Sequence, residues 1–472
     1  MRVIVWFRGK DLRVADHAPL AEASGAREVI PLVVLDPEAF TPERVREMPH
    51  HVQFLLDALL VLQRSIANLG SRLVVVRGKS ADVIPHLFRN WQVDRLLAHR
   101  RVEPSWRKVD ERLRDALGSA FELHEGETLL PPGTLRTGAG RPYAVFTQFA
   151  RSFRAATQGL LGKPSVAPSR LPPLPKALSG DFSEIPSVEQ LGLSRNTALQ
   201  GGGEEAAQRR LRHFVNGAAA AYAQMRDRMD LAGTSRLSAD LKFGTLSARQ
   251  VWTAVESLGE KADAFRNELV WREFCYSTLW DRPELLQKPF RSTFEGFPWQ
   301  YDEKHWQAWV LGKTGHPIVD AASRQLLGEG FVHNRARMVS ASFLCKHLLI
   351  DYRRGEKHYM KYLTDGDSAQ NNAGWQWSAG CGCDAQPYFR VFNPVTQGEK
   401  FDPEGNYVRR WVPELAALPA KYIHNPWAAP ADVLRAANVR LGDSYPLPIV
   451  EHASARERFL AMAAGFLKRV DR

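Results

Sequence analysis

One stretch, residues 364–401, combines side chains that rarely occur together unless they contact a polar aromatic ligand. Asp365 and Asp367 flank a glycine, two asparagines follow, and Trp375 and Trp377 come next. Carboxylates and amides lose hydration when they are buried beside indole rings, and a planar ligand with hydrogen-bonding edges would compensate both kinds of group. The alternative is a solvated turn followed by a pair of core tryptophans, and this stretch alone favours neither interpretation.

A second segment has the groups that bind phosphates. Residues 234–238 have the sequence TSRLS and follow a glycine between two helical patterns. Hydroxyl groups, backbone N–H groups and an arginine at the start of a helix suit a phosphate. The same residue types are common at helix caps that bind nothing, so the segment alone is a weak signal.

A third segment, residues 267–274, places an acid, an aromatic ring and a cation on one helix face. Glu268, Trp271 and Arg272 are spaced i, i+3 and i+4, so they are neighbours on a helix. Asn334 and Met338 share a face in the same way. Such faces suit a ligand the size of a base, whereas the alternative for the first is a surface salt bridge beside a core tryptophan.

Length and composition indicate a soluble protein with two domains. The 472 residues exceed what one hydrophobic core usually supports. Lys and Arg outnumber Asp and Glu by 63 to 52, and the net charge of +11 favours a polyanionic partner without choosing among DNA, RNA and membrane surfaces. No signal peptide is recognised and no apolar run approaches the roughly 18 residues that span a bilayer, so we expect a cytoplasmic protein.

The four cysteines give no metal-binding pattern. Cys275, Cys345, Cys381 and Cys383 form no CxxC pair and lack histidines at the spacing of zinc ligands. Half of a metal site at Cys381 and Cys383 is the alternative. We expect no metal and a reducing compartment.

The first 125 residues alternate between strand and helix patterns. Apolar runs predict strands over 3–7, 29–35, 73–76 and 95–98. Helical spacing predicts helices over 17–23, 52–69, 81–88 and 106–117, with Asp16 as the cap of the first. This alternation predicts an α/β domain, residues 1–125, with an open, mostly parallel sheet and helices on both faces. No GxGxxG follows a strand, so the signature of a dinucleotide site is missing.

The rest of the chain divides into a connector and a helical domain. Six prolines between residues 164 and 186 predict irregular structure, so residues 126–203 are expected to form a long connector. Residues 204–472 are expected to form an all-helical domain. Its predicted helices cover 204–225, 247–257, 264–279, 304–311, 317–327, 334–351 and 453–470.

Seven motifs, in this order, resemble those of the photolyase/cryptochrome family. They are TSRLS, NELVWREF, GKTGHPIVDAA, HNRARM, DGD, NNAGWQW and YFRVFNPVTQGEKFD, and together with the N-terminal VWFRGKDLRVADH they cover nearly the whole chain. The last motif is most similar to that of microbial, class I-type cyclobutane pyrimidine dimer photolyases. The resemblance implies an α/β antenna domain followed by a helical domain that binds FAD.

The resemblance also implies which residues contact the cofactor. The hydroxyl-rich segment would bind the FAD phosphates, Arg337 would pair with Asp365 beside the flavin ring system, and Phe265 would make only a packing contact. Asn371 would face the flavin N5, where an amide serves several redox states without adding charge, and this favours repair over a receptor function. The residues implied for FAD are Tyr222, Thr234, Ser235, Arg236, Leu237, Ser238, Phe265, Arg272, Arg337, Asp365, Gly366, Asp367 and Asn371.

A substrate site follows from the same resemblance. Trp271 and Trp377 would stack on a flipped-out pyrimidine dimer, and Glu268 would hydrogen-bond a thymine edge. Asn334 and Met338 would complete the pocket. The DNA backbone would be held by Arg226, Arg335 and Gln397.

The implied activity is light-driven repair of pyrimidine dimers in DNA by electron transfer from reduced FAD, in a monomer without a metal. One alternative is a cryptochrome-like blue-light photoreceptor. A weaker one is a (6-4) photoproduct photolyase, which usually needs a histidine pair where this chain has HNRARM. Asn371, the dimer-binding set and the short C-terminal end favour dimer repair.

The resemblance leaves two features open. The family relays electrons to the flavin through three tryptophans; Trp375 matches the member next to the flavin and Trp309 the surface member, but the middle position is Tyr352. We therefore expect slow photoreduction of oxidised FAD, with Trp306 as a possible detour. The antenna position has Glu103 and Pro104 in place of a clear folate-type acid, so a folate, a deazaflavin, a flavin, no chromophore and a simple helix start all stay open.

Overall fold

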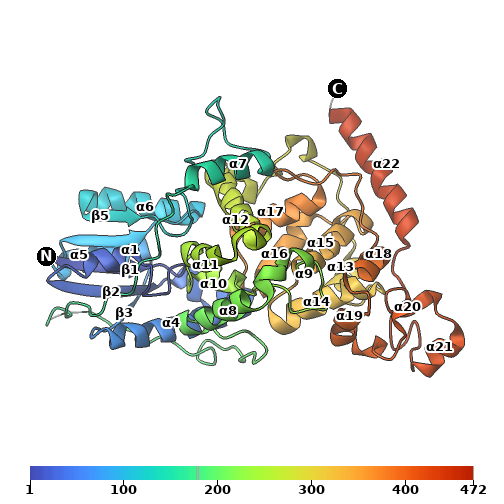
Figure 1. Ribbon diagram of the computed structural model, residues 1–472, viewed down its shortest axis with the longest axis horizontal. Coiled ribbons are helices and arrows are strands. Elements are labelled where there is room, and N and C mark those ends of the chain that lie inside the picture. The colour runs from blue at the N-terminus through green and yellow to red at the C-terminus, as the bar shows by residue number, and fades with distance from the viewer. Residues whose placement is uncertain (177, 179, 471–472) are drawn as a thin grey trace. The chain divides into compact units, whose positions relative to one another are not determined.

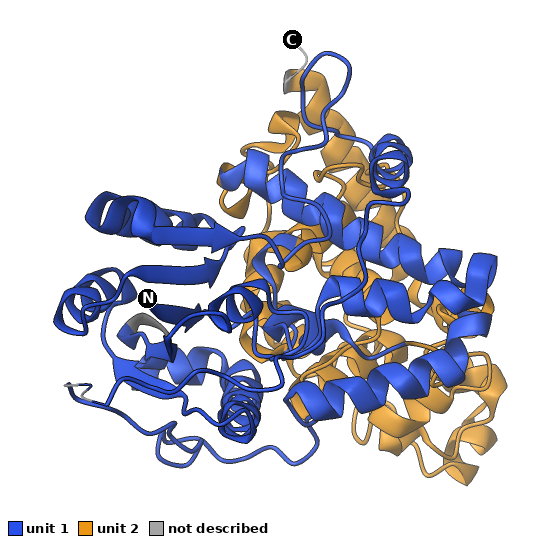
Figure 2. Ribbon diagram, turned by 60° about the vertical axis from the view of Figure 1, so that its left-hand side comes forward, with its two compact units in different colours: residues 1–222, 235–283, 364–369 blue, residues 223–234, 284–363, 370–472 orange. Residues whose placement is uncertain are grey.

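The chain folds into two compact units, each built from segments that are distant in the sequence (Figures 1 and 2). The computed structural model describes residues 1–176, 178 and 180–470. Unit 1 comprises Met1–Tyr222, Ser235–Pro283 and Thr364–Ala369, and unit 2 comprises Ala223–Thr234, Glu284–Leu363 and Gln370–Arg472. The short acidic segment 364–369 therefore belongs to the same unit as the N-terminal sheet.

The sheet of unit 1 has five parallel strands in the order β3-β2-β1-β4-β5. They are β1 (Arg2–Phe7), β2 (Glu28–Leu35), β3 (Val74–Arg77), β4 (Arg95–His99) and β5 (Phe121–His124). The first four strands and the parallel arrangement confirm the prediction. The edge strand β5 was not predicted because only Phe121 of its four residues is buried, so it has no continuous apolar run.

Both faces of the sheet are buried, as the apolar runs require. On one face Val3 and Val5 pack with residues such as Phe54 of α4 (Pro49–Asn68). On the other face Trp6 packs with Ile84 of α5 (Ser80–Asn90) and Leu113 of α6 (Pro104–Leu117). Two further helices with proline at their first position, α2 (Pro37–Phe40) and α3 (Pro42–Glu47), precede α4.

The predicted cap of the first helix is wrong by one residue. Helix α1 (Ala18–Ala23) is capped by His17, whose Nδ1 accepts a hydrogen bond from Leu20 N at 3.1 Å. Asp16 has a φ of 52°, and its carboxylate instead accepts hydrogen bonds from Ser247 Oγ at 2.6 Å and from Arg249. Because the Asp16 carboxylate forms this long-range ion pair with Arg249, it does not cap α1.

The connector and the helical segments of unit 1 contain a second set of packed elements. Helix α7 (Phe146–Thr157) lies within the connector and buries Phe149 and Phe153. The predicted helix 204–225 is interrupted at Gly217 and yields α8 (Glu204–Asn216) and α9 (Tyr222–Met225). They are followed by α10 (Ser238–Phe243), α11 (Ala248–Ala254) and α12 (Asp263–Asp281).

Unit 2 is helical and has one large apolar core. Its elements are α13 (Glu303–Val310), α14 (Pro317–Glu329), α15 (Asn334–Ser342), α16 (Tyr352–Tyr362), most of α17 (Ser368–Ala379), α18 (Pro394–Phe401), α19 (Asn406–Trp411), α20 (Ala420–Ile423), α21 (Ala431–Ala436) and α22 (His452–Val470). No helix within the described residues has the length and hydropathy needed to cross a bilayer.

The predicted helix 334–351 does not run through. It passes into a π-helical turn at Phe343–His347, and Leu349 then adopts a φ of 57°, which a branched side chain rarely does. Asp351 caps the next helix, α16, by accepting a hydrogen bond from Arg353 N at 2.9 Å. This break sets the position at which Tyr352 begins α16.

Candidate functional site

The predicted site residues are distributed over both units. Unit 1 holds Tyr222, Ser235, Arg236, Leu237, Ser238, Phe265, Glu268, Trp271, Arg272, Asp365, Gly366 and Asp367. Unit 2 holds Arg226, Thr234, Trp309, Asn334, Arg335, Arg337, Met338, Tyr352, Asn371, Trp375, Trp377 and Gln397.

The phosphate-type segment has the backbone of an anion-binding turn. Arg236 has a φ of 56°, and Ser235 Oγ accepts a hydrogen bond from Leu237 N at 3.4 Å. Leu237 follows with a φ of −91° and a ψ of 2°, and a left-handed residue next to a right-handed one lets successive N–H groups converge on one point, as in an anion-binding nest. The backbone of the segment is therefore compatible with the predicted phosphate site.

An aromatic cluster in unit 1 fixes two of the predicted residues. The ring of Phe265 lies 5.3 Å from that of Tyr222 and 4.6 Å from that of Phe214. Both predicted residues are buried, and Phe265 packs against protein rings. The cluster connects α12 to α8 and α9.

Helix α12 presents the predicted acid, ring and cation. Trp271 is half-buried and stacks on Phe146 of α7 with ring centroids 3.7 Å apart and planes within 6°. Arg272 is buried, and its guanidinium lies over the Tyr276 ring at 4.5 Å. Phe146 therefore supports one face of Trp271, a role that the sequence did not reveal.

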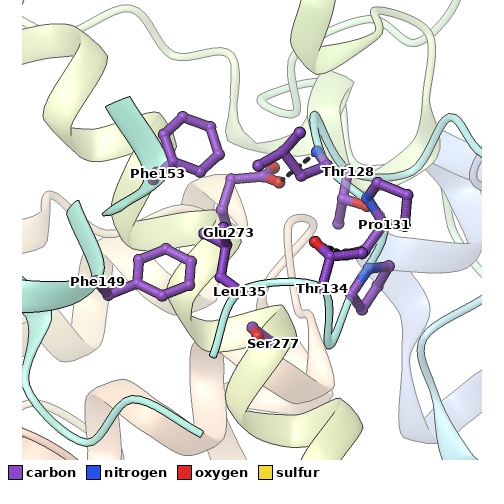
Figure 3. A pocket seen from close by; sticks show the side chains of 10 residues that line it. Thr128, Pro131, Thr134, Leu135, Phe149, Phe153, Glu273 and Ser277 are labelled. Atoms are coloured by element: carbon purple, nitrogen blue, oxygen red, sulfur yellow. Dashed lines mark hydrogen bonds between the residues drawn. The ribbon is translucent and has the colours of Figure 1, made fainter. Parts of the chain in front are cut away.

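A small cavity in unit 1 is lined by Glu273 and Ser277 of α12 and by residues of α7 and the connector (Figure 3). Glu273 Oε2 accepts a hydrogen bond from Leu129 N at 2.9 Å. Burial raises the pKa of the Glu273 carboxyl to about 7, against the opposing effect of Arg272. The cavity volume of about 10 Å³ is far below the roughly 300–1,000 Å³ of small-molecule sites, so this cavity does not hold a flavin.

The segment Thr364–Ala369 is held by Asp367. Oδ1 of this buried carboxylate accepts a hydrogen bond from Ala369 N at 3.0 Å, and Oδ2 accepts one from Tyr276 O–H at 2.7 Å and one from Lys10 Nζ at 2.8 Å. Asp365 is half-buried in the same segment. The two predicted acids thus have different surroundings.

In unit 2, helix α17 presents Asn371 with a fixed amide. Its Nδ2 donates to the backbone carbonyl of Glu356 on α16 at 3.0 Å. The neighbouring Asn372 donates to both carboxylate oxygens of Glu356, at 3.1 and 3.2 Å. Glu356 therefore orients both amides, through its backbone and through its side chain.

The partly buried carboxyl of Glu356 makes folding stability dependent on pH. Burial raises its pKa to about 7, above the ordinary 4.5, although Asn372 acts in the opposite direction. Because the folded state holds this proton more tightly than the unfolded chain, stability falls as pH rises through this window, by up to about 3 kcal/mol. Glu356→Gln is expected to remove that loss, so the variant gains stability over the wild type at about pH 8 but not at about pH 5.

Urea unfolding of both proteins at the two pH values measures this difference. Glu205→Gln, at an exposed position, provides the control and is expected to change neither value. An equal stability difference between wild type and Glu356→Gln at both pH values would contradict the prediction.

The tryptophans of unit 2 form a continuous row that corrects one expectation. Trp309 is only 1% exposed, so it is not a surface residue; its ring lies 6.1 Å from Trp375 and 5.4 Å from Trp306. A Cβ at Gly355 would clash with the Trp375 ring, which explains the glycine there. The row 375–309–306 therefore leads from α17 to α13.

Tyr352 belongs to a separate aromatic pair. Its ring lies 6.4 Å from that of Trp299, a partly exposed tryptophan that the sequence interpretation did not consider. Tyr352 is 2% exposed, and its hydroxyl has no hydrogen-bond partner among the described residues. Burial raises the pKa of this phenol well above 10, so the group has no ready route for proton loss.

The residues predicted to contact DNA lie on α15, α18 and the segment Ala223–Thr234. Asn334 Nδ2 lies 3.7 Å from Met338 Sδ, which confirms that the two share a helix face. Arg335 is paired with Asp227 at 2.7 Å, so part of its charge is already balanced within the protein. Arg337 donates from Nε to the carbonyl of Val332 at 2.8 Å.

Most of the chain matches two protein-family models. Residues 3–173 match the family model described as DNA photolyase, and residues 265–464 match that of the FAD binding domain of DNA photolyase. The deoxyribodipyrimidine photo-lyase of Agrobacterium fabrum is 40% identical over 99% of this chain and 98% of that protein.

Two solved structures are similar over almost their whole length. A bacterial class III photolyase from Agrobacterium tumefaciens superimposes with a TM-score of 0.92 at 40% identity and covers 99% of this chain and 98% of its own. A cryptochrome from Synechocystis superimposes with a TM-score of 0.89 at 30% identity and covers 98% and 99%.

The parallel five-stranded sheet and the helical FAD-binding domain define a flavoprotein of the photolyase fold. The chain belongs to the photolyase/cryptochrome family.

Proposed function

We propose that this protein repairs cyclobutane pyrimidine dimers in DNA under blue light, with FAD as the cofactor. The observation that carries the proposal is the stack of Trp271 on Phe146, beside Glu268 on the same helix face. A half-buried ring supported from behind is a rigid platform for a flat base. The 40% identity with a deoxyribodipyrimidine photo-lyase supports the same reaction.

The donor groups of the chain fit the cofactor. The nest at Arg236 suits a diphosphate, and the buried guanidinium of Arg272 offers a second positive charge. The amide of Asn371, fixed by Glu356, would offer a neutral polar group to the flavin ring system. When bound, FAD supplies the electron that light makes available to the damaged bases.

The chain's own residues bind and orient the substrate. Trp271 and Trp377 stack on the two flipped-out bases, and Glu268 hydrogen-bonds a thymine edge, which helps to stabilise negative charge on the dimer. Arg226, Arg335 and Gln397 contact the DNA backbone. Flipping costs a few kcal/mol, and less for a dimer that already stacks poorly, so lesions are selected without reading the sequence.

The test is illumination of the purified, FAD-loaded protein with an oligonucleotide that contains one thymine dimer. Blue light is expected to restore the two thymines, whereas an oligonucleotide with a (6-4) photoproduct stays unrepaired. Conversion of the (6-4) lesion alone would contradict the assignment of the substrate.

The second candidate is a cryptochrome-like photoreceptor, favoured by the TM-score of 0.89 with the Synechocystis cryptochrome. Light-dependent flavin chemistry without repair of either lesion would support this candidate and overturn the first.

The subclass is a separate question. The motif at residues 388–402 favours the microbial class I type, and the similarity to the Agrobacterium structure favours class III. The proposed reaction and cofactor are the same for both.

A further inference from the structure

Lys10 lies in the loop between β1 and α1, and nothing in the proposed reaction uses it. Its side chain is only 2% exposed, and its Nζ lies 2.5 Å from Glu127, 2.6 Å from Glu103 and 2.8 Å from Asp367. It also donates to Tyr276 Oη at 3.1 Å. Three carboxylates at metal-ligand spacing thus converge on an ammonium group, which occupies the place where a cation would sit.

All members of this cluster belong to unit 1, and they come from five separate parts of the chain. Beyond Lys10 and its partners, the surrounding charged or titratable groups are Arg101, Lys242, Arg272, Glu273 and His51. Lys242 lies 3.6 Å from Asp367 and 3.9 Å from Glu103, beyond hydrogen-bond distance. Arg101 Nη2 donates to Glu103 at 3.1 Å, whereas at Asp367 the contact of Lys10, at 2.8 Å, is shorter than that of Lys242.

Asp367 connects this cluster to the predicted flavin residues. One of its oxygens holds Ala369 N at the start of α17, and the other is bound by Lys10 and Tyr276. The carboxylate therefore fixes the backbone two residues after Asp365. Burial acts to raise the pKa of Asp367, but Lys10 and then Lys242 outweigh it and hold the pKa well below its ordinary value.

We propose that Lys10 is a positioning residue: by binding Asp367 it fixes the segment 364–369 and thereby the geometry of the FAD site. This inference rests on the proposed function, which assigns Asp365 and Asp367 to FAD. A buried pair that loses one partner leaves an uncompensated charge, so removal of Lys10 displaces Asp367 from its position.

Lys10→Met is the decisive variant. Its FAD dissociation constant is expected to rise at least about tenfold, and amide hydrogen exchange in residues 364–379 is expected to accelerate in the FAD-free protein. Because the three remaining carboxylates raise each other's pKa, FAD binding by the variant is expected to weaken further as pH rises from about 5 to about 7. The wild type is expected to bind FAD equally over this range.

Arg8→Met is the matched control, since Arg8 is a buried cation of the same loop. Its Nη2 lies 2.6 Å from Asp110, away from the segment 364–369. This variant is expected to lose stability but to keep the wild-type exchange in residues 364–379 and the wild-type FAD affinity. The double variant Lys10→Met/Glu127→Gln removes one charge of each sign. Compared with Lys10→Met, it is expected to recover part of the FAD affinity and part of the slow amide exchange in residues 364–379.

The outcomes separate the inference from the proposed function. Unchanged exchange in residues 364–379 together with pH-independent FAD binding in Lys10→Met would overturn the role of Lys10, as would an Arg8→Met variant with the same effects. Failure of the wild type to bind FAD would instead overturn the proposed function. The exchange measurement on the FAD-free protein would still test whether Lys10 fixes the segment 364–369. If Lys10→Met does not fold, the double variant gives the same two readouts.

Discussion

Trp309→Phe is expected to slow the photoreduction of oxidised FAD by at least about tenfold, equivalent to about 1.4 kcal/mol in the barrier. Trp309 connects Trp375, at 6.1 Å, to Trp306, at 5.4 Å, and no other described ring contacts both of these indoles. Phenylalanine is much harder to oxidise than tryptophan, so the substitution interrupts the row. Photoreduction kinetics under steady blue light with an added electron donor measure the effect.

Tyr352→Phe is expected to change the same rate little. The Tyr352 hydroxyl is buried without a partner among the described residues, so oxidation of this phenol cannot be coupled to proton loss. Tyr352→Trp is expected to accelerate photoreduction, because it joins Trp299 to a second oxidisable ring. The row through Trp309 is the competing route for electrons.

Trp411→Phe, at a half-buried tryptophan of unit 2 outside the row, is the control. Repair by FAD that has been reduced chemically is expected to be unaffected in every variant, which separates electron supply from folding. The prediction fails if Trp309→Phe keeps the wild-type rate of photoreduction and Tyr352→Phe loses it. That result would show that the electrons pass through Tyr352.

Trp271→Ala is expected to weaken binding to dimer-containing DNA roughly 5- to 150-fold, the equivalent of about 1–3 kcal/mol for one lost stacking platform. Affinity for undamaged duplex is expected to stay the same, because that binding depends on the basic surface. Phe146→Ala removes only the support behind Trp271 and is expected to cost about 0.5–1.5 kcal/mol of damage binding.

Binding is measured in the dark at constant salt, with damaged and undamaged duplexes of the same sequence. Trp280→Ala on the same helix is the control, since Trp280 packs against Arg107 and not against Phe146. Equal losses for both duplexes in Trp271→Ala would indicate a folding defect, and no loss for either would exclude Trp271 from the substrate site.

Local patterns predicted the sheet and most helices correctly because those elements are decided by nearby residues. The strands β1 and β2 are continuous apolar runs, and the i, i+4 spacing placed Asn334 and Met338 together. The break after Ser342 was missed because residues 334–351 look continuously helical, and tertiary packing imposes the π-helical turn and the φ of Leu349.

Motifs supply candidate site residues, whereas contacts between distant segments leave no local signal in the sequence. The segments TSRLS and DGD identified the residues around Arg236 and Asp367. The partner of Trp271 is Phe146, more than a hundred residues earlier and outside any motif. Spacing likewise gave no information on burial, so Trp309 was taken for a surface residue although it is in the core.

The ion-pair cluster of Lys10 with Glu103, Glu127 and Asp367 cannot be completed until late in synthesis of the chain. Glu127 follows Lys10 by 117 residues, but Asp367 follows it by 357. At about 5–20 residues per second, a ribosome needs roughly 10–50 seconds between these two carboxylates. During that interval Lys10, Glu103 and Glu127 have been synthesised but Asp367 has not. The nascent N-terminal part therefore lacks one of the three carboxylates that bind Lys10. Unit 1 therefore closes only after residues 223–234 and 284–363 of unit 2, fewer than half of that unit, have been synthesised.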